Sequence, residues 1–313
     1  MKSVRILLAC ALVLSCSVSE AVKITVFCNG ITPNAGLYFV TAGPDGNVWF
    51  GEQIAGKIGK ITPSGVVTEY SSGITSGASI EGITTGPDGN LWFAEFGIHR
   101  IGKITPSGVV TEYSVGISPD ASPYAITAGP DGNLWFTEYN GFRIGKITTS
   151  GVVTEYSLPT PGARPYGITV GPDNNLWFTE NNVAQIGKIT TAGLVTEYGG
   201  LTPGAGPDAI TTGPDKNLWF AEDGDPCIGK ITTAGVVTEY RNGITGFNLV
   251  GITTWKGRLI FTEANSDLLA MITTAGAVKE GSITSNSLPY YITVGPDGRL
   301  WFAENYTNCI ARK

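Results

Sequence analysis

Polar and aromatic side chains recur at two positions of a repeated pattern in this 313-residue chain. The first position lies two residues before a recurrent Ile or Val, and its occupants are Tyr38, Glu81, Tyr124, Tyr166, Asp208, Val250 and Tyr290. The second directly follows a repeated glutamate, and its occupants are Gln53, Phe96, Tyr139, Asn181, Asp223, Ala264 and Asn305. Aromatic faces stack on planar groups, and carboxylates accept hydroxyl donors or hold a cation. We therefore predict a site for a polar, planar ligand, formed by Tyr38, Glu81, Tyr124, Tyr139, Tyr166, Asp208, Asp223 and Tyr290.

The other titratable residues that recur or stand out are the repeated glutamates, the recurrent lysines and a single histidine. The repeated glutamate itself is expected to be structural, accepting backbone N–H groups, at Glu52, Glu95, Glu138, Glu180, Glu222, Glu263 and Glu304. The recurrent lysines are expected to form a solvated stripe, at Lys60, Lys103, Lys146, Lys188 and Lys230. His99 is the single histidine of the chain, which excludes any mechanism that needs two. We expect it to lie at the surface without a partner.

Composition narrows the class of protein. Hydrophobic residues make up 42% and charged residues 15%, so the chain is not disordered through high charge. The net charge of −6 leaves no basic surface for a phosphate backbone, and we expect no nucleic-acid partner. With 43 glycines and 18 prolines, the chain is rich in turns, which favours an all-β protein.

A repeat of 41 to 43 residues organises the sequence. Its unit begins GPDGNLWF(T/A)E, continues through a variable loop to IGKIT, and ends in GVVTEY. The tryptophan of this unit returns at fixed intervals, with Ile260 in its place in the sixth unit, at Trp49, Trp92, Trp135, Trp177, Trp219 and Trp301. Seven units leave no room for a second domain.

Each unit contains four short β segments. In the second unit these are residues 83–85, 90–95, 100–105 and 109–113, separated by turns rich in Gly and Pro. Four strands per unit of this length predict a seven-bladed β-propeller with four-stranded blades. The 1–2 and 3–4 turns are nearly constant and share one face, whereas the 2–3 and 4–1 loops vary on the other. Variation on a constant scaffold indicates a binding face at the mouth of the central channel.

The two ends of the repeat array predict how the ring closes. The seventh unit reaches only its third strand, at 309–313, and residues 23–27 match the fourth-strand pattern. The N-terminal strand should therefore complete the last blade. By repeat alignment Cys28 and Cys309 then face each other, so we predict a disulfide that contributes about 4–5 kcal/mol on the loop-entropy model. The alternative is two unpaired buried thiols.

Residues 1–21 have the pattern of a signal peptide, and residues 22–313 form the propeller. Lys2 and Arg5 precede an apolar run too short to span a bilayer, and small residues precede a cleavage point after Ala21. We therefore expect a secreted monomer without a transmembrane segment. A lipobox-like stretch ending at Cys16 leaves a lipid-anchored or periplasmic form open. Asn305-Tyr306-Thr307 is a sequon, so Asn305 is a candidate glycosylation site.

The repeat ITxGPDGNLWFTE…IGKIT…GVVTEY closely resembles the virginiamycin B lyase (streptogramin lyase) family from Lys23 to Lys313. The resemblance implies a seven-bladed propeller, and an activity that opens a cyclic depsipeptide by elimination with Mg²⁺ and a histidine base. Family repeats often carry Pro-His-Gly before the innermost strand. Here the matching triplets begin at Pro123, Pro165, Pro207 and Pro289, and none contains histidine.

The intact repeat and the missing histidines leave two possible functions. The first is a binding or interaction protein that takes a small molecule, a glycan or a protein at the cavity mouth, because the scaffold is intact and the family histidines are absent. The alternative is a metal-dependent carbon–oxygen lyase acting on a lactone, ester or related substrate. It would use Glu81, Asp208 or tyrosines in place of histidine, with Mg²⁺ implied by the resemblance.

Overall fold

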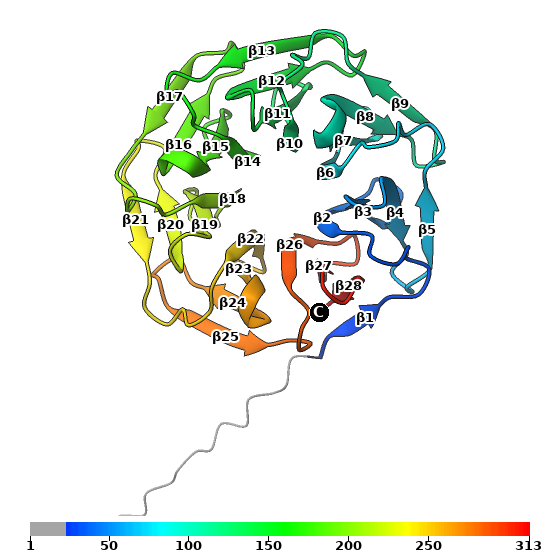
Figure 1. Ribbon diagram of the computed structural model, residues 1–313. Coiled ribbons are helices and arrows are strands. Elements are labelled where there is room, and N and C mark those ends of the chain that lie inside the picture. The colour runs from blue at the N-terminus through cyan, green and yellow to red at the C-terminus, as the bar shows by residue number, and fades with distance from the viewer. Residues whose placement is uncertain (1–22) are drawn as a thin grey trace, which may run out of the picture.

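The computed structural model describes residues 23–313. Seven four-stranded antiparallel sheets stand around a common axis and form a closed ring (Figure 1), which confirms the predicted seven-bladed propeller. The predicted signal peptide, residues 1–21, lies outside the described residues, as do Cys10 and Cys16. Among the described residues, no helix is long and apolar enough to cross a membrane.

The strands fall into four concentric rings. The innermost strands are β2 (Leu37–Ala42), β6 (Ile80–Thr85), β10 (Pro123–Ala128), β14 (Pro165–Val170), β18 (Pro207–Thr212), β22 (Leu249–Trp255) and β26 (Pro289–Val294). The second strands are β3 (Val48–Glu52), β7 (Leu91–Glu95), β11 (Leu134–Glu138), β15 (Leu176–Glu180), β19 (Leu218–Glu222), β23 (Arg258–Glu263) and β27 (Leu300–Glu304). The third strands are β4 (Lys57–Ile61), β8 (Arg100–Ile104), β12 (Arg143–Ile147), β16 (Gln185–Ile189), β20 (Cys227–Ile231), β24 (Leu268–Ile272) and β28 (Cys309–Arg312). The outer strands are β5 (Val67–Tyr70), β9 (Val110–Tyr113), β13 (Val153–Ser157), β17 (Val195–Tyr198), β21 (Val237–Tyr240), β25 (Val278–Ser282) and β1 (Thr25–Phe27).

The last blade is completed by the N-terminal strand, as predicted. Its strand order is β1-β28-β27-β26, and Phe27 of β1 pairs with Ile310 of β28. One residue further on, Cys28 and Cys309 form a disulfide with their Cα atoms 4.3 Å apart. The predicted pairing is confirmed. Closure leaves no blade with an unfilled fourth-strand position, where an open sheet edge would invite aggregation.

In six of the seven blades, the aspartate of a Gly-Pro-Asp turn holds the buried tryptophan by a hydrogen bond. In the second blade, Gly89 takes a φ of +72°, and Asp88 accepts a hydrogen bond from the indole N–H of Trp92 at 3.0 Å. A Cβ at Gly86 would lie 2.4 Å from that indole, so only glycine fits there. The tryptophan is fully buried, and it packs with Ile126 and Phe136 of the next blade. These contacts between blades form the core.

The recurrent lysines do not form a solvated stripe, and that expectation is wrong. The ammonium group of Lys103 lies 5.2 Å from the ring centre of Trp92 and 5.6 Å from that of Tyr113. Lys60 repeats this arrangement over Trp49, and its side chain is mostly buried. Each lysine therefore covers a Trp–Tyr stack with its positive charge, an interaction that stabilises the blade.

The repeated glutamates are buried, but backbone N–H groups do not satisfy them as expected. Both carboxylate oxygens of Glu95 lack a hydrogen-bond partner. The side chain instead faces Glu112 of the outer strand, which accepts the backbone N–H and hydroxyl of Thr75 at 2.6 and 2.7 Å. Burial first, and then the charge of Glu112, raise the pKa of Glu95 to about 8. The neutral acid is therefore the favoured form of Glu95 at neutral pH.

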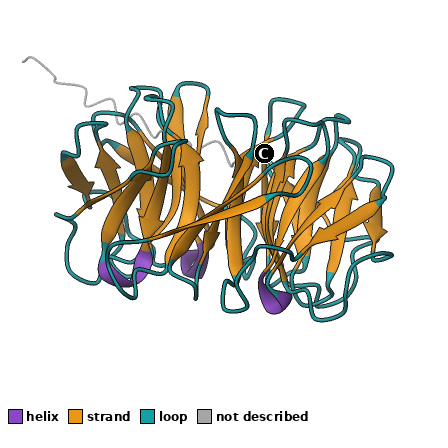
Figure 2. Ribbon diagram, turned by 90° about the horizontal axis from the view of Figure 1, so that it is seen from above, coloured by secondary structure: helices purple, strands orange, loops and turns teal. Residues whose placement is uncertain are grey.

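Three short 3₁₀ turns follow second strands, and in Figure 2 all three lie on one face of the disc. They are η1 (Phe96–Ile98), η2 (Asn181–Val183) and η3 (Ala264–Ser266). This is the face of the variable 2–3 and 4–1 loops. His99 ends η1 with a φ of +56°, and its Nδ1 accepts the backbone N–H of Ser122 at 2.9 Å. The expectation that His99 has no partner is therefore wrong.

Candidate functional site

Every innermost strand carries an irregularity just where the predicted ligand-binding residues lie. In β6, Ile80 pairs with Glu95 and Ile83 with Phe93, so β6 has one residue more than its partner between these pairs. The sequence placed the start of this strand at Ile83, three residues too late, because the bulge interrupts the alternation. Bulges redirect side chains and are common beside functional sites. Here Glu81, inside the bulge, lines a central cavity.

Buried threonines hold some of these bulges in place. Thr137 of β11 accepts the N–H of Ala125 at 3.0 Å and donates to the carbonyl of Tyr166 in the next blade at 2.8 Å. Thr179 of β15 makes the same pair of bonds to Gly167 and Asp208. These threonines fix the backbone from which cavity side chains project, so they are positioning residues.

The cavity encloses about 240 Å³ and draws on both predicted sets of residues. Its lining comes from blades 1 to 4 and consists of Tyr38, Gln53, Glu81, Phe96, Tyr124, Tyr139 and Tyr166. Five of the eight predicted ligand-binding residues therefore meet in one cavity: Tyr38, Glu81, Tyr124, Tyr139 and Tyr166. That they bind a ligand remains a prediction.

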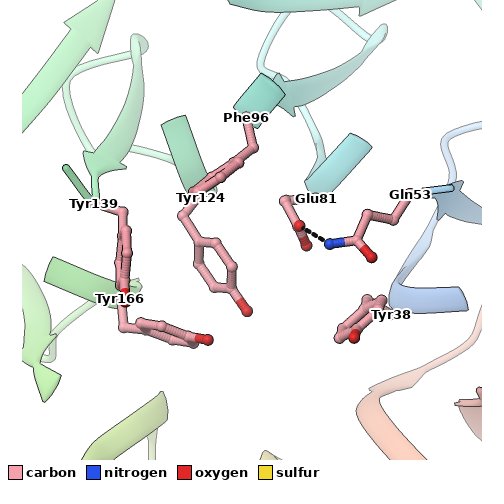
Figure 3. A pocket seen from close by; sticks show the side chains of 7 residues that line it. All are labelled: Tyr38, Gln53, Glu81, Phe96, Tyr124, Tyr139 and Tyr166. Carbon is pink, nitrogen blue, oxygen red and sulfur yellow. Dashed lines mark hydrogen bonds between the residues drawn. The ribbon is translucent and has the colours of Figure 1, made fainter. Parts of the chain in front are cut away.

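The two sides of the cavity differ in chemistry (Figure 3). Phe96, Tyr124, Tyr139 and Tyr166 form an aromatic wall, with ring centres of Tyr124 and Tyr166 4.1 Å apart. Glu81 and Gln53 lie opposite this wall, with Tyr38 below them in the view of Figure 3. The wall offers ring faces, and the opposite side offers an acid and an amide.

Glu81 is the most unusual polar group of the cavity. Its side chain is only 3% exposed, and one carboxylate oxygen accepts a hydrogen bond from the amide of Gln53. The other oxygen, Oε2, is buried without a hydrogen-bond partner. Burial raises the pKa of Glu81 to about 7, although the bond from Gln53 acts in the opposite direction. This carboxyl group therefore titrates near neutral pH.

Phe39 and Tyr291, two large side chains that were not predicted, pack next to the cavity through Tyr124. Phe39 stacks on Tyr291 with ring centres 3.6 Å apart, and it meets Tyr124 edge-on at 5.6 Å. The other five inner strands carry Gly or Ala at the position of Phe39 and Tyr291. Two large aromatic residues at a position of small residues were the sequence signal that could have found this contact. The hydroxyl of Tyr291 donates to Asp208 at 2.5 Å. Burial raises the pKa of Asp208, which favours the neutral acid.

The remaining predicted residues lie outside the cavity lining. Tyr290 stacks on Tyr38 at 4.5 Å, next to the cavity. Asp208 is buried with Tyr291, as described above, and burial raises the pKa of Asp223. Asn305 donates its amide to the carbonyl of Leu37 at 3.0 Å, and its glycosylation remains a prediction.

Mg²⁺ is the ion that the family resemblance implies, and it needs a cluster of oxygen ligands. Across residues 23–313 there is no group of three or more His, Cys, Asp or Glu side chains that could hold a metal ion. Asp208 is engaged with Tyr291, and one oxygen of Glu81 is engaged with Gln53. Mg²⁺ demands near-octahedral oxygen coordination. The residues present therefore do not fit this ion.

Comparisons with known proteins agree with the architecture. The model of the virginiamycin B lyase family matches residues 28–246 and 200–313. A streptogramin B lyase structure is 39% identical, with a TM-score of 0.87 over 93% of this chain and 96% of that one. Virginiamycin B lyase from Staphylococcus aureus is 38% identical, with a TM-score of 0.86 over 93% and 98%.

A third solved structure is a catalytically inactive histidine-to-alanine variant of the Staphylococcus aureus enzyme with quinupristin. It is 38% identical, with a TM-score of 0.85 over 93% of this chain and 98% of that chain. Comparison with curated protein sequences gives no match.

Proposed function

The chain belongs to the virginiamycin B lyase family, and from that premise we propose that it is a secreted binding protein. Its ligand is a small molecule, a glycan or a protein side chain held in the central cavity. The observation that carries this proposal is Glu81 Oε2, a buried carboxylate oxygen without a partner that lines an aromatic cavity. A buried acceptor of this kind is costly unless a donor reaches it.

The proposal favours binding over catalysis because of the histidine content. A relative of this chain becomes catalytically inactive when one histidine is replaced by alanine. The single histidine here, His99, is absent from the cavity lining and uses its Nδ1 to accept the N–H of Ser122. A histidine base for elimination is therefore missing from the cavity.

Secretion is supported by two features of this chain. Residues 1–21 have the charge and hydropathy pattern of a signal peptide. The Cys28–Cys309 disulfide suits an oxidising compartment. N-terminal sequencing of protein from the culture medium tests the proposal, with Val22 expected as the first residue. Protein retained in cells with an intact Met1 contradicts it.

The binding proposal is tested by a ligand screen on matched variants. Thermal shift with libraries of small molecules, glycans and peptides is expected to yield ligands that raise the melting temperature by mass action. Tyr139→Leu removes a face of the aromatic wall and should abolish those shifts. Tyr306→Leu changes a tyrosine that is 75% exposed and outside this cavity, and should leave them intact. Shifts that survive Tyr139→Leu would contradict binding in this cavity.

A carbon–oxygen lyase is the second candidate, and the pKa of Glu81 favours it. A general base works best with a pKa near the working pH, and burial raises the pKa of Glu81 to about 7. Glu81 would take a proton from the carbon next to the ester-bearing carbon. The C–H electron pair would form a C=C bond, and the C–O bond would break to release a carboxylate.

Turnover of lactones and esters by purified protein decides between the two candidates. The lyase predicts measurable turnover that Glu81→Gln or Tyr124→Phe abolishes without unfolding the protein. The binding proposal predicts no turnover in the wild-type protein. Turnover that both variants retain contradicts this assignment of the base.

A further inference from the structure

The cavity combines a buried acid with ring faces, and this combination is specific for a charged ligand. We propose that it selects a small organic cation, an alkylated ammonium group placed between Glu81 and the aromatic wall. This inference rests on the proposed binding function and specifies its ligand class.

The carboxylate supplies the charge. Glu81 Oε2 is buried and unpartnered, while Oε1 is already engaged by Gln53. A carboxylate in a site of low dielectric attracts a cation more strongly than it would in water. Two of its neighbours are the phenols of Tyr124 and Tyr166, and burial raises the pKa of Tyr124 well above its ordinary value. Burial raises the pKa of Tyr166 well above its ordinary value, so this ring remains uncharged.

The aromatic wall supplies ring faces at several angles. Tyr139 meets Tyr166 edge-to-face, with centres 5.6 Å apart and planes 74° apart. Tyr124 lies 6.2 Å from Tyr139 and is tilted by 38°. Because these rings are inclined to one another, their faces point in different directions. Each ring attracts a cation that lies within about 6 Å of its centre. Tyr139 already accepts one cation of the chain itself, the guanidinium of Arg164 at 5.2 Å.

Size and donor chemistry argue against other ligands. The cavity, at about 240 Å³, is smaller than the roughly 300–1,000 Å³ of sites for drug-sized ligands, so it suits a headgroup. A metal cation would need several oxygen ligands, and residues 23–313 contain no group of three acidic, Cys or His side chains to hold one. An alkylated ammonium needs no ordered ligand sphere, because its methyl groups lie on the rings.

The decisive probe pair is choline and 3,3-dimethylbutan-1-ol, which have the same shape and differ in charge. Isothermal titration of the full purified protein at pH 8, where Glu81 is ionised, is expected to show at least tenfold tighter binding of choline. Glu81→Gln keeps the shape of the side chain and removes its charge. It should weaken choline binding about tenfold, within the range of desolvated cation contacts, and leave the alcohol unchanged.

Two further variants complete the design. Tyr139→Leu should weaken choline at least threefold, and Tyr306→Leu should have no effect. If Glu81→Gln does not fold, Tyr139→Leu carries the test. Equal binding of both probes, or choline binding that Glu81→Gln leaves unchanged, overturns the cation inference.

The cation inference and the binding function fail in different ways. No choline binding, together with a neutral ligand whose binding depends on Tyr139, overturns the inference and retains the function. If no ligand from the screen depends on Tyr139, both are overturned.

Discussion

At the scale of single residues, the behaviour of the cavity depends on how its carboxyl groups are buried. Asp208 is paired with the hydroxyl of Tyr291, and burial raises its pKa. Glu81 has one oxygen paired with Gln53 and one free, and burial raises its pKa to about 7. Two acids in neighbouring environments therefore differ in what they offer a ligand.

The pKa of Glu81 can be measured directly. The carboxyl carbon of Glu81, assigned in a ¹³C NMR titration by its loss in Glu81→Gln, should titrate with a midpoint near pH 7. Gln53→Leu removes a donor that stabilises the charged form, so the midpoint should move upward. A midpoint near the ordinary glutamate value, unmoved by Gln53→Leu, would show that water reaches the carboxylate.

At the scale of elements, each of the first six blades places a buried glutamic acid of its second strand against a carboxylate of its outer strand. Burial first and then Glu112 raise the pKa of Glu95 to about 8. Although partial burial opposes it, the hydrogen bonds from Thr75 lower the pKa of Glu112. Glu112 also holds the 4–1 loop that arrives from the previous blade, through these bonds. The protonation state of Glu95 therefore affects a contact between neighbouring blades.

The raised pKa of Glu95 predicts that the free energy of unfolding falls as pH rises. The folded pKa of about 8 lies above the ordinary 4.5, so between these values the folded state binds more protons than the unfolded state. Stability from this group is complete below pH 4.5 and is lost as pH rises to 8, with a limiting slope of about 1.4 kcal/mol per pH unit. In urea unfolding, the free energy of unfolding of Glu95→Gln should increase relative to that of the wild-type protein as pH rises.

The seventh blade offers a matched control for that measurement. There the position equivalent to Glu112 is Val26, and Glu304 accepts a hydrogen bond from Thr307 at 2.9 Å. Glu304→Gln should therefore gain less than Glu95→Gln over the same pH range. Equal gains in both variants would mean that burial alone, without the facing carboxylate, sets the effect.

The elements also show how far sequence reasoning reaches. The repeat predicted the blades, the closing strand and the two sets of positions that line the cavity, because identical units must repeat one geometry. It did not predict the bulge before Ile83, since an inserted residue breaks the alternation that defines a strand. The stack of Phe39 on Tyr291 joins the first blade to the last, which is its neighbour in the closed ring, and no pattern within one unit encodes which side chains meet between blades.

At the scale of the whole molecule, the ring is held by contacts between blades and by one covalent closure. The donor chemistry gives no reason for a structural metal in residues 23–313. The melting temperature should therefore be unchanged by excess EDTA and by Mg²⁺ or Ca²⁺ added back, measured by differential scanning calorimetry. A metal-dependent rise would place a cation on the protein and would favour the lyase candidate.

The disulfide closes the ring at a sequence separation of 281 residues, and it is the one covalent cross-link within residues 23–313. Constraining the unfolded chain over such a loop stabilises the native state by about 5 kcal/mol on the loop-entropy model. The double variant Cys28→Ser/Cys309→Ser should lose about that amount in urea unfolding. The expected cause is the unfolded chain, because the hydrogen-bonded pairing of β1 with β28 remains available without the S–S bond.

Cys227→Ser is the control for this experiment. It removes the free cysteine of the described chain, which is buried and whose pKa is raised by burial. Dithiothreitol should lower the melting temperature of wild type and of Cys227→Ser, and leave the double variant unaffected. If the double variant matches wild type in urea, the pairing between the first and last strands is by itself enough to close the ring, and the disulfide contributes nothing measurable to its stability.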